Sequence, residues 1–364
     1  MSVDFSRDVH GLLGLPFDAI NMAGAVRRVR RAVAERTSCF MSTPNLTFLI
    51  GCGSDEKFRD SVLNSDLSVA DGMPIVWLAR LLDIPIRERV AGSDLFDVLR
   101  GDRQSRLSVF FFGGPDGVAE VACRQLTAEN RGMTCAGFES PGFGSLDEIS
   151  RDEIIARINA SKADFLLVAL GAKKGQAWIE RNRARITVPV ISHLGAVVNF
   201  VAGSVRRAPV WMQKTGLEWT WRIKEEPGLW RRYFDDGLAL IRLLLTYVLP
   251  YVWFLRTHKP ATADIASASV TFDDGAKTYE IRLHGAWIQR NITPLRTAFT
   301  EAAQSGKDIQ LDLSATTCID SAFVGLAMLL YGYQKRQGRK LLLSAAPHVV
   351  QRVITYSGAD YLLA

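Results

Sequence analysis

The chain has 364 residues, 48% hydrophobic and 23% charged, which is typical of a folded globular protein and excludes a disordered one. It is too long for one ordinary hydrophobic core, so we expect two domains. The net charge of +6 and the pI near 9.1 favour anionic partners: nucleotides, phosphorylated lipids, an anionic membrane or nucleic acid.

The N-terminus and the cysteines indicate a cytosolic protein. The first twenty residues carry acidic side chains where a signal peptide would have a basic flank and an apolar run, so secretion is not expected. The five cysteines are an odd number without metal-ligand or redox spacing, and we expect them all to be reduced. The five histidines form no cluster. We therefore predict neither a metal site nor a cofactor.

The first half of the chain alternates short apolar runs with helical periods. Strands are predicted at residues 38–42, 67–70, 107–114, 133–138, 163–171 and 188–195. Helices are predicted between them, at 55–64, 116–130 and 146–160. This alternation is typical of an α/β fold with a parallel sheet covered by helices on both faces. Ligands of such folds bind at the carboxyl ends of the strands.

Residues 206–233 hold four of the eight tryptophans, interleaved with Arg and Lys. One interpretation is a helix with an aromatic core face and a solvated basic face. The other is a surface that meets a phosphate-bearing ligand at a membrane.

The apolar run 238–255 is slightly short of the ~20 residues that span a bilayer, and Arg242 and Pro250 interrupt it. We favour a helix lying in the membrane interface over a full span, and a core or dimer helix is the third option.

A second domain is predicted after a small, polar, Pro-containing linker at 257–267. Residues 268–364 restart the α/β pattern, with strands at 269–273, 279–285, 308–314 and 340–346 and helices at 292–306, 322–338 and 347–358.

Several polar residues follow predicted strands, where chemistry is expected. Thr43 and Asn45 follow the first strand, and Asp71 follows the second at a helix start, where an ordinary N-cap is the alternative role. Arg89 lies in a charged run, and Gln176 follows the fifth strand. The chain contains no Asp-x-Asp pair, so a sugar-nucleotide enzyme of this sequence would neutralise its diphosphate with Arg and Lys.

The order of motifs resembles the WecG/TagA/CpsF family of bacterial glycosyltransferases over roughly residues 10–245. The motifs are "TPN", "ADGM", "ERVAGSDL", "FFFGG", "GAKKGQAWI", "GAVVNFVAG" and "RRAPVWMQKTGLEWTWRIKEEP…LWRRY". The resemblance implies a Rossmann-like nucleotide-sugar core at 1–205 and a helical, membrane-proximal appendage at 206–256.

The resemblance also implies an activity and a location. Such enzymes transfer a sugar from a UDP-sugar donor to an undecaprenyl-diphosphate-linked saccharide, with inversion and without a metal. The implied location is the cytoplasmic face of the inner membrane, peripheral or monotopic, in cell-surface or extracellular polysaccharide synthesis. Nucleic acid is then not a partner.

By the same resemblance, Asp71 is the general base that deprotonates the acceptor hydroxyl. The residues expected to bind substrate are Thr43, Asn45, Arg89, Gln176, Arg222, Arg231 and Arg232. The three appendage arginines would hold a diphosphate.

The chain departs from the pattern of the family at two places. Relatives commonly read "G.PKQE.W" where this chain has Lys173 in place of Pro, Gly175 in place of Gln and Gln176 in place of the acid. Relatives read "G.GG.FDF.AG" where it has "HLGAVVNFVAG", with Asn199 in place of the acid. These changes motivate an alternative, a catalytically degenerate scaffold or regulator of polysaccharide assembly.

Residues 268–364 resemble a STAS domain through "IQLDLSATTCIDSAFVGLAMLL". Switchable members carry "DSSG" with a phosphorylated Ser in third place, and here that place is Ala322. The resemblance therefore favours docking of a protein partner or scaffolding over a phospho-switch. A third reading of the whole chain stays open: a nucleotide-binding regulator whose STAS module is the active part.

Overall fold

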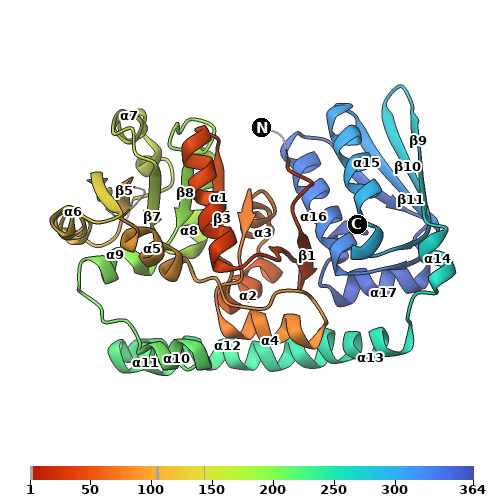
Figure 1. Ribbon diagram of the computed structural model, residues 1–364, viewed down its shortest axis with the longest axis horizontal. Helices are drawn as coiled ribbons and strands as arrows, with labels where there is room; N and C mark the ends of the chain where they lie inside the picture. The colour runs from red at the N-terminus through yellow and green to blue at the C-terminus, as the bar shows by residue number, and fades with distance from the viewer. Residues whose placement is uncertain (1–2, 104–105, 143) are drawn as a thin grey trace.

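A computed structural model describes residues 3–103, 106–142 and 144–364. Two α/β units stand side by side, and one long helical segment runs beneath both of them (Figure 1). The N-terminal unit contains a six-stranded sheet in the order β4-β3-β8-β7-β5-β6, with every neighbouring pair parallel. Its strands are β3 (Cys39–Ser42), β4 (Leu67–Ser68), β5 (Leu107–Gly113), β6 (Met133–Glu139), β7 (Phe165–Ala169) and β8 (Val190–His193). All six predicted strands and the parallel arrangement are confirmed.

Helices cover both faces of this sheet because its strands are apolar on both sides. One face packs against α1 (Met22–Glu35), α5 (Gly92–Gly101), α6 (Val118–Glu129) and α9 (Gly195–Val201). The other face packs against α7 (Asp152–Ala160) and α8 (Ala172–Asn182). A short 3₁₀ turn, Glu148–Ser150, precedes α7.

The prediction that all cysteines are reduced is wrong for one pair. Cys123 on α6 and Cys135 on β6 form a disulfide, with their Cα atoms 5.1 Å apart. Helix α6 packs against β6, the strand that follows it, so residues separated by 12 positions become neighbours. Cys39, Cys52 and Cys318 are free.

An N-terminal hairpin, which the sequence analysis missed, joins the two units. It consists of β1 (Val9–Leu12) and β2 (Leu15–Asp18). On one side, Asp18 accepts a hydrogen bond from the backbone N–H of Ser68 at 2.7 Å and pairs with Arg7 at 2.7 Å. On the other side, the hairpin packs against a helix of the C-terminal unit.

The C-terminal unit has a four-stranded sheet in the order β12-β11-β10-β9. Strand β9 (Ser269–Asp274) pairs antiparallel with β10 (Thr278–Trp287), whereas β10, β11 (Asp308–Ile319) and β12 (Leu341–Ser344) are parallel. Its main helices are α15 (Thr293–Gln304), α16 (Ser321–Arg336) and α17 (His348–Tyr356), with 3₁₀ turns at Gln289–Asn291 and Asp360–Leu362. These elements confirm the α/β pattern predicted for this region.

One hydrophobic cluster is shared by the two units, in addition to the clusters on the two faces of the N-terminal sheet. A single cluster of buried side chains joins the hairpin, the helices α2 (Leu46–Ser54), α3 (Glu56–Leu63) and α4 (Met73–Leu81), and the C-terminal sheet. The segment predicted to be a linker packs against the C-terminal unit, because its helix α14 (Thr262–Ala266) contacts β10.

The start of α16 is covered by the chain's own hairpin. Asp320 caps this helix by accepting hydrogen bonds from the backbone N–H groups of Ala322 and Phe323. Ser321 is buried, and its hydroxyl lies 2.9 Å from Nδ1 of His10 on β1.

The appendage consists of α10 (Val210–Thr215), α11 (Glu218–Glu225) and a continuous helical segment, Pro227–Thr257. This segment comprises a 3₁₀ turn (Pro227–Leu229), α12 (Trp230–Leu243), a π-helical turn (Leu244–Val248) and α13 (Leu249–Thr257). It is long and apolar enough to cross a membrane, which by itself is weak evidence for a span. One side of its C-terminal half is buried against α17, where Tyr251 and Phe254 both contact Tyr356.

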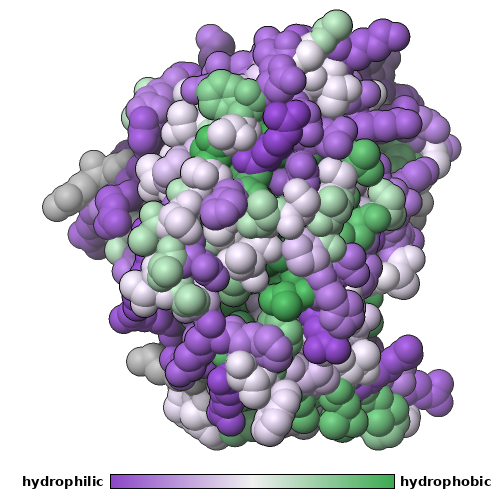
Figure 2. Space-filling view, turned by 90° about the vertical axis from the view of Figure 1, so that its right-hand side faces the viewer, coloured by the Kyte–Doolittle hydropathy of each residue, from purple (hydrophilic) through white to green (hydrophobic). Residues whose placement is uncertain are grey.

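The other side of the appendage carries a stripe of exposed apolar side chains, which we call the apolar edge. Figure 2 shows apolar residues gathered at the lower edge of the molecule, where the long helix lies in Figure 1. The apolar edge comprises Val210, Trp211, Trp230, Phe234, Leu238, Ile241, Leu245, Leu249 and Trp253, each more than half exposed.

Candidate active site

The carboxyl ends of β3, β4 and β8 open into a pocket of about 970 Å³. Thr43, Asp71 and His193 line it from these three strand ends. Helices α10, α11 and α12 of the appendage form its opposite wall. The pocket therefore lies at the edge of the sheet where ligands of parallel α/β folds bind, and the appendage closes over it.

Asp71 does not act as the ordinary helix cap that was its alternative role. Helix α4 is capped by Gly72 without a side-chain hydrogen bond, and the Asp71 carboxylate instead faces the backbone N–H of Gly92 at 3.4 Å. Burial raises the pKa of Asp71 to about 7, with Arg89 opposing this rise and Glu218 adding to it. A carboxylate with a pKa near neutrality is suited to accept a proton at physiological pH.

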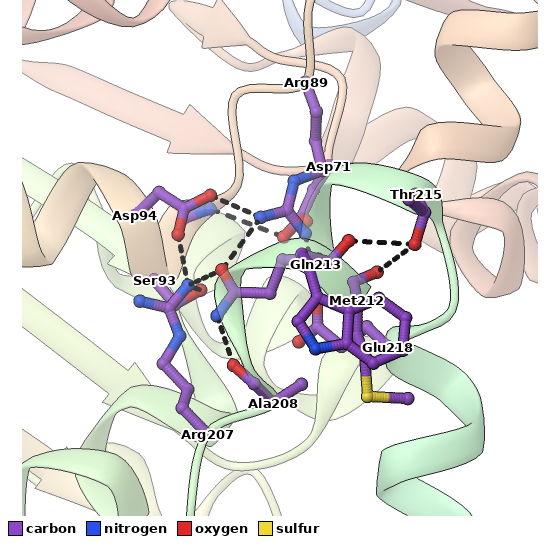
Figure 3. A network of polar contacts seen from close by, with 12 residues as sticks. Asp71, Arg89, Ser93, Asp94, Arg207, Ala208, Met212, Gln213, Thr215 and Glu218 are labelled. Atoms are coloured by element: carbon purple, nitrogen blue, oxygen red, sulfur yellow. Dashed lines mark hydrogen bonds and ion pairs between the residues drawn. The ribbon is translucent and has the colours of Figure 1, made fainter.

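A network of ion pairs fastens the appendage to the core beside Asp71 (Figure 3). Arg89 pairs with Glu218 of α11 at 2.8 Å and with Asp94 of α5 at 2.5 Å. Arg207, which precedes α10, pairs with Asp94 and Asp97 and donates to the Ser93 hydroxyl at 2.9 Å. We call Arg89, Asp94, Arg207 and Glu218 the latch.

The latch gives Arg89 a structural role that the sequence did not reveal. Its guanidinium lines the pocket, yet it is engaged by carboxylates of the core and of the appendage. Glu218 and Asp94 were missed, although both lie inside quoted motifs, "GLEW" and "GSDL".

Two predicted arginines of the appendage meet at the pocket. Arg222 and Arg232 both line it, and both lie near the phenol of Tyr233. Burial raises the pKa of this phenol, and the two positive charges oppose that rise. The Nε of Arg222 is buried without a hydrogen-bond partner among the described residues. The same guanidinium lies 3.5 Å from the carboxylate of Glu226 through its Nη2.

Helix α12 is held at the pocket by α2. Asn45 caps α2 by accepting a hydrogen bond from the backbone N–H of Phe48 at 3.2 Å, and it also lines the pocket. Thr47, two positions further on, donates to Asp236 at 2.8 Å and accepts from Arg232 at 3.1 Å. These contacts place Arg232 beside the first turn of α2.

Two of the predicted site residues do not line this pocket. Gln176 is buried beneath it, and its side-chain amide donates to the hydroxyl of Ser42 at 3.0 Å. Arg231 is exposed on α12, with its guanidinium over the ring of Trp230 at 5.5 Å. The structure thus brings together Thr43, Asn45, Asp71, Arg89, Arg222 and Arg232, but not these two.

Among the described residues, the arginines that line the pocket are Arg89, Arg222 and Arg232. No group of three or more His, Cys, Asp or Glu side chains among the described residues is arranged to hold a metal ion.

Comparison with known proteins identifies relatives for both units. Residues 10–251 match the model of the glycosyl transferase WecG/TagA/CpsF family, and residues 270–364 match that of the Mlab STAS domain. An N-acetylglucosaminyldiphosphoundecaprenol N-acetyl-beta-D-mannosaminyltransferase of Bacillus spizizenii is 27% identical over 199 residues, 54% of this chain and 76% of the relative. The enzyme of the same name from Staphylococcus aureus strain MW2 is 24% identical over 224 residues, 61% of this chain and 85% of the relative.

Proposed function

Because the chain belongs to the WecG/TagA/CpsF family of glycosyltransferases, we propose that it transfers a sugar from a UDP-sugar to a polyprenyl-diphosphate-linked saccharide, with inversion and without a metal. The relatives are named for an acceptor of this kind, N-acetylglucosaminyldiphosphoundecaprenol. The observation that carries the proposal is the meeting of Asp71 with Arg222 and Arg232 in one pocket.

The proposed reaction is a direct displacement. The Asp71 carboxylate takes the proton of the acceptor hydroxyl as its oxygen bonds to the anomeric carbon. The bond from that carbon to the diphosphate breaks on the opposite face, so UDP leaves with the bonding electrons and the configuration inverts. The raised pKa of Asp71 supports this role, because its conjugate acid then holds the proton at neutral pH.

The arginines would stabilise the charge that develops on the departing diphosphate. Arg222 and Arg232 come from the appendage, so they complete the site only when the appendage lies against the core. The position of both guanidinium-bearing side chains in the pocket lining supports binding of an anion there.

The apolar edge supports a location at the membrane surface. Six of its nine side chains lie on α10 and α12, which wall the pocket, so a lipid-linked acceptor can reach Asp71 without leaving the bilayer. The opposite side of α13 packs against α17, which favours a helix lying in the interface over a span. We propose the cytoplasmic face of the inner membrane, where nucleotide-sugars are available.

The proposed function is tested by incubating the full chain with a radiolabelled UDP-sugar and a polyprenyl-diphosphate-linked N-acetylglucosamine. We expect label in the lipid product, undiminished by a metal chelator, and an anomeric configuration opposite to that of the donor. Failure of every UDP-sugar to react, despite binding of UDP, would favour the alternative of a degenerate scaffold. A product of retained configuration would contradict direct displacement.

A further inference from the structure

His193 is a buried histidine that the sequence analysis did not single out. It is the last residue of β8, it lines the pocket beside Leu194, and it is 8% exposed. Its Nδ1 lies 3.0 Å from the backbone carbonyl of Val168 on the neighbouring strand β7. Since a carbonyl can only accept, Nδ1 carries the hydrogen, and Nε2 of the neutral ring is left as an acceptor.

Burial favours this neutral form and lowers the pKa of His193 to about 4. No described residue hydrogen-bonds to Nε2. This atom is also absent from the fully buried polar atoms that lack a partner, so it is in contact with solvent. A β-carbon at Gly195 would lie 3.4 Å from Nε2, so the glycine at that position keeps the approach to it open.

The ring occupies space that a second glycine provides. A β-carbon at Gly175 on α8 would lie only 2.5 Å from Nδ1 of His193, closer than atoms can pack. A side chain at residue 175 therefore requires the ring of His193 to shift or to be absent.

We propose that His193 binds the nucleoside part of the UDP-sugar donor, with Nε2 accepting a hydrogen bond from it; this rests on the proposed function. A phosphate has no hydrogen to offer a neutral imidazole, so the partner is an N–H or O–H group. In the order β4-β3-β8, the end of β8 lies two strand spacings, about 10 Å, from the end of β4 that holds Asp71. The hydrogen bond of His193 is therefore made to a part of the donor that is remote from the reacting carbon.

The test is calorimetric titration of the full chain with UDP and with the UDP-sugar that is turned over. His193→Ala should weaken both ligands by the same factor, roughly three- to tenfold, because one neutral hydrogen bond is lost. The KM for the donor should rise with little change in kcat. The exposed His284→Ala on β10 is the matched control and should bind both ligands as the unaltered chain does.

Equal binding of UDP by His193→Ala and the unaltered chain overturns the proposal, as does weakening confined to the UDP-sugar, which would place the bond on the sugar. If the unaltered chain binds neither ligand, the proposed function itself fails. These outcomes are distinguishable.

A thermal-unfolding cycle tests the packing independently of activity. Gly175→Ala should lower the unfolding temperature of the unaltered chain but not of the His193→Ala variant, because the clash is with this ring. An equal cost in both backgrounds would contradict a clash between residue 175 and the ring of His193.

Discussion

At the scale of single residues, the protonation of Asp71 decides how the proposed reaction depends on pH. Its pKa is raised to about 7, so below pH 7 most molecules carry the protonated acid, which cannot act as a base. We therefore expect kcat/KM to increase with pH through a midpoint near 7. A pH–rate profile from pH 5.5 to 8.5 measures this increase, and a kcat/KM that is constant across that range would contradict it.

Glu218 offers a way to shift the midpoint of this pH dependence. Its negative charge contributes to the raised pKa of Asp71, so Glu218→Gln should shift the midpoint to lower pH. Glu129→Gln is a control that removes an ion pair with arginine far from the pocket, and its midpoint should match that of the unaltered chain. A shift to higher pH in Glu218→Gln would mean that weakened contact with Arg89 outweighs the lost charge.

At the scale of secondary-structure elements, the hairpin and α16 depend on a close approach of backbones. A β-carbon at Gly325 would lie 2.7 Å from the carbonyl oxygen of Val9 and 2.9 Å from the Cα of His10. Gly325→Ala should therefore destabilise the chain by about 1–3 kcal/mol, as overpacking in a rigid core does. Chemical denaturation measures this cost.

Gly53→Ala is the matched control for that prediction. Gly53 is exposed near the end of α2, and its β-carbon would meet nothing within 4 Å. Alanine there should stabilise the chain by about 0.5–1 kcal/mol, because glycine weakens a helix. If Gly325→Ala behaves as Gly53→Ala does, the hairpin is not seated on α16 as described.

The elements show which features a single sequence can predict. The parallel strands were predictable because each is a short apolar run followed by a turn. The hairpin was not, because "VHGL" and "LPFD" contain Gly and Pro and are stabilised by α16, about 300 positions away. The disulfide was not predictable either, because only the packing of α6 on β6 brings Cys123 and Cys135 together.

The same distinction holds for the pocket. Thr43 and Asp71 follow strands, and the rule that ligands bind at strand ends found both. His193 lies near the end of the strand predicted at 188–195 and is the last residue of β8, so the same rule could have found it. The latch was not predictable from spacing, since Arg89 and Glu218 are 129 positions apart and meet only when the appendage folds over the core.

At the scale of the whole molecule, the shared core makes the C-terminal domain a support for the appendage. This domain packs against α13, and α13 continues through one helical segment into the pocket wall formed by α12. Ser321 is buried against His10, so a kinase would have to separate the two units to reach it. We therefore propose that any protein partner of the STAS domain docks on the exposed edge strand β9, and not at the start of α16.

The apolar edge should bind the chain to lipid bilayers. Leu245→Glu and Trp253→Glu place charges on this edge and should each reduce co-flotation with anionic phospholipid vesicles by about tenfold or more. Phe272→Glu is the matched control, because Phe272 is an exposed apolar residue on β9 of the C-terminal unit. Equal loss in all three variants would show that flotation does not depend on the apolar edge.

The account depends most on Asp71 and the appendage arginines acting in one step on one sugar diphosphate. The most direct measurement is the single-turnover rate of sugar transfer by Asp71→Asn, by Arg222→Gln/Arg232→Gln, and by the triple variant. We expect Asp71→Asn to lose at least about a hundredfold in rate, and the triple variant to be little slower than Asp71→Asn alone. Transfer by Asp71→Asn at the rate of the unaltered chain, or losses that multiply fully in the triple variant, would contradict this account.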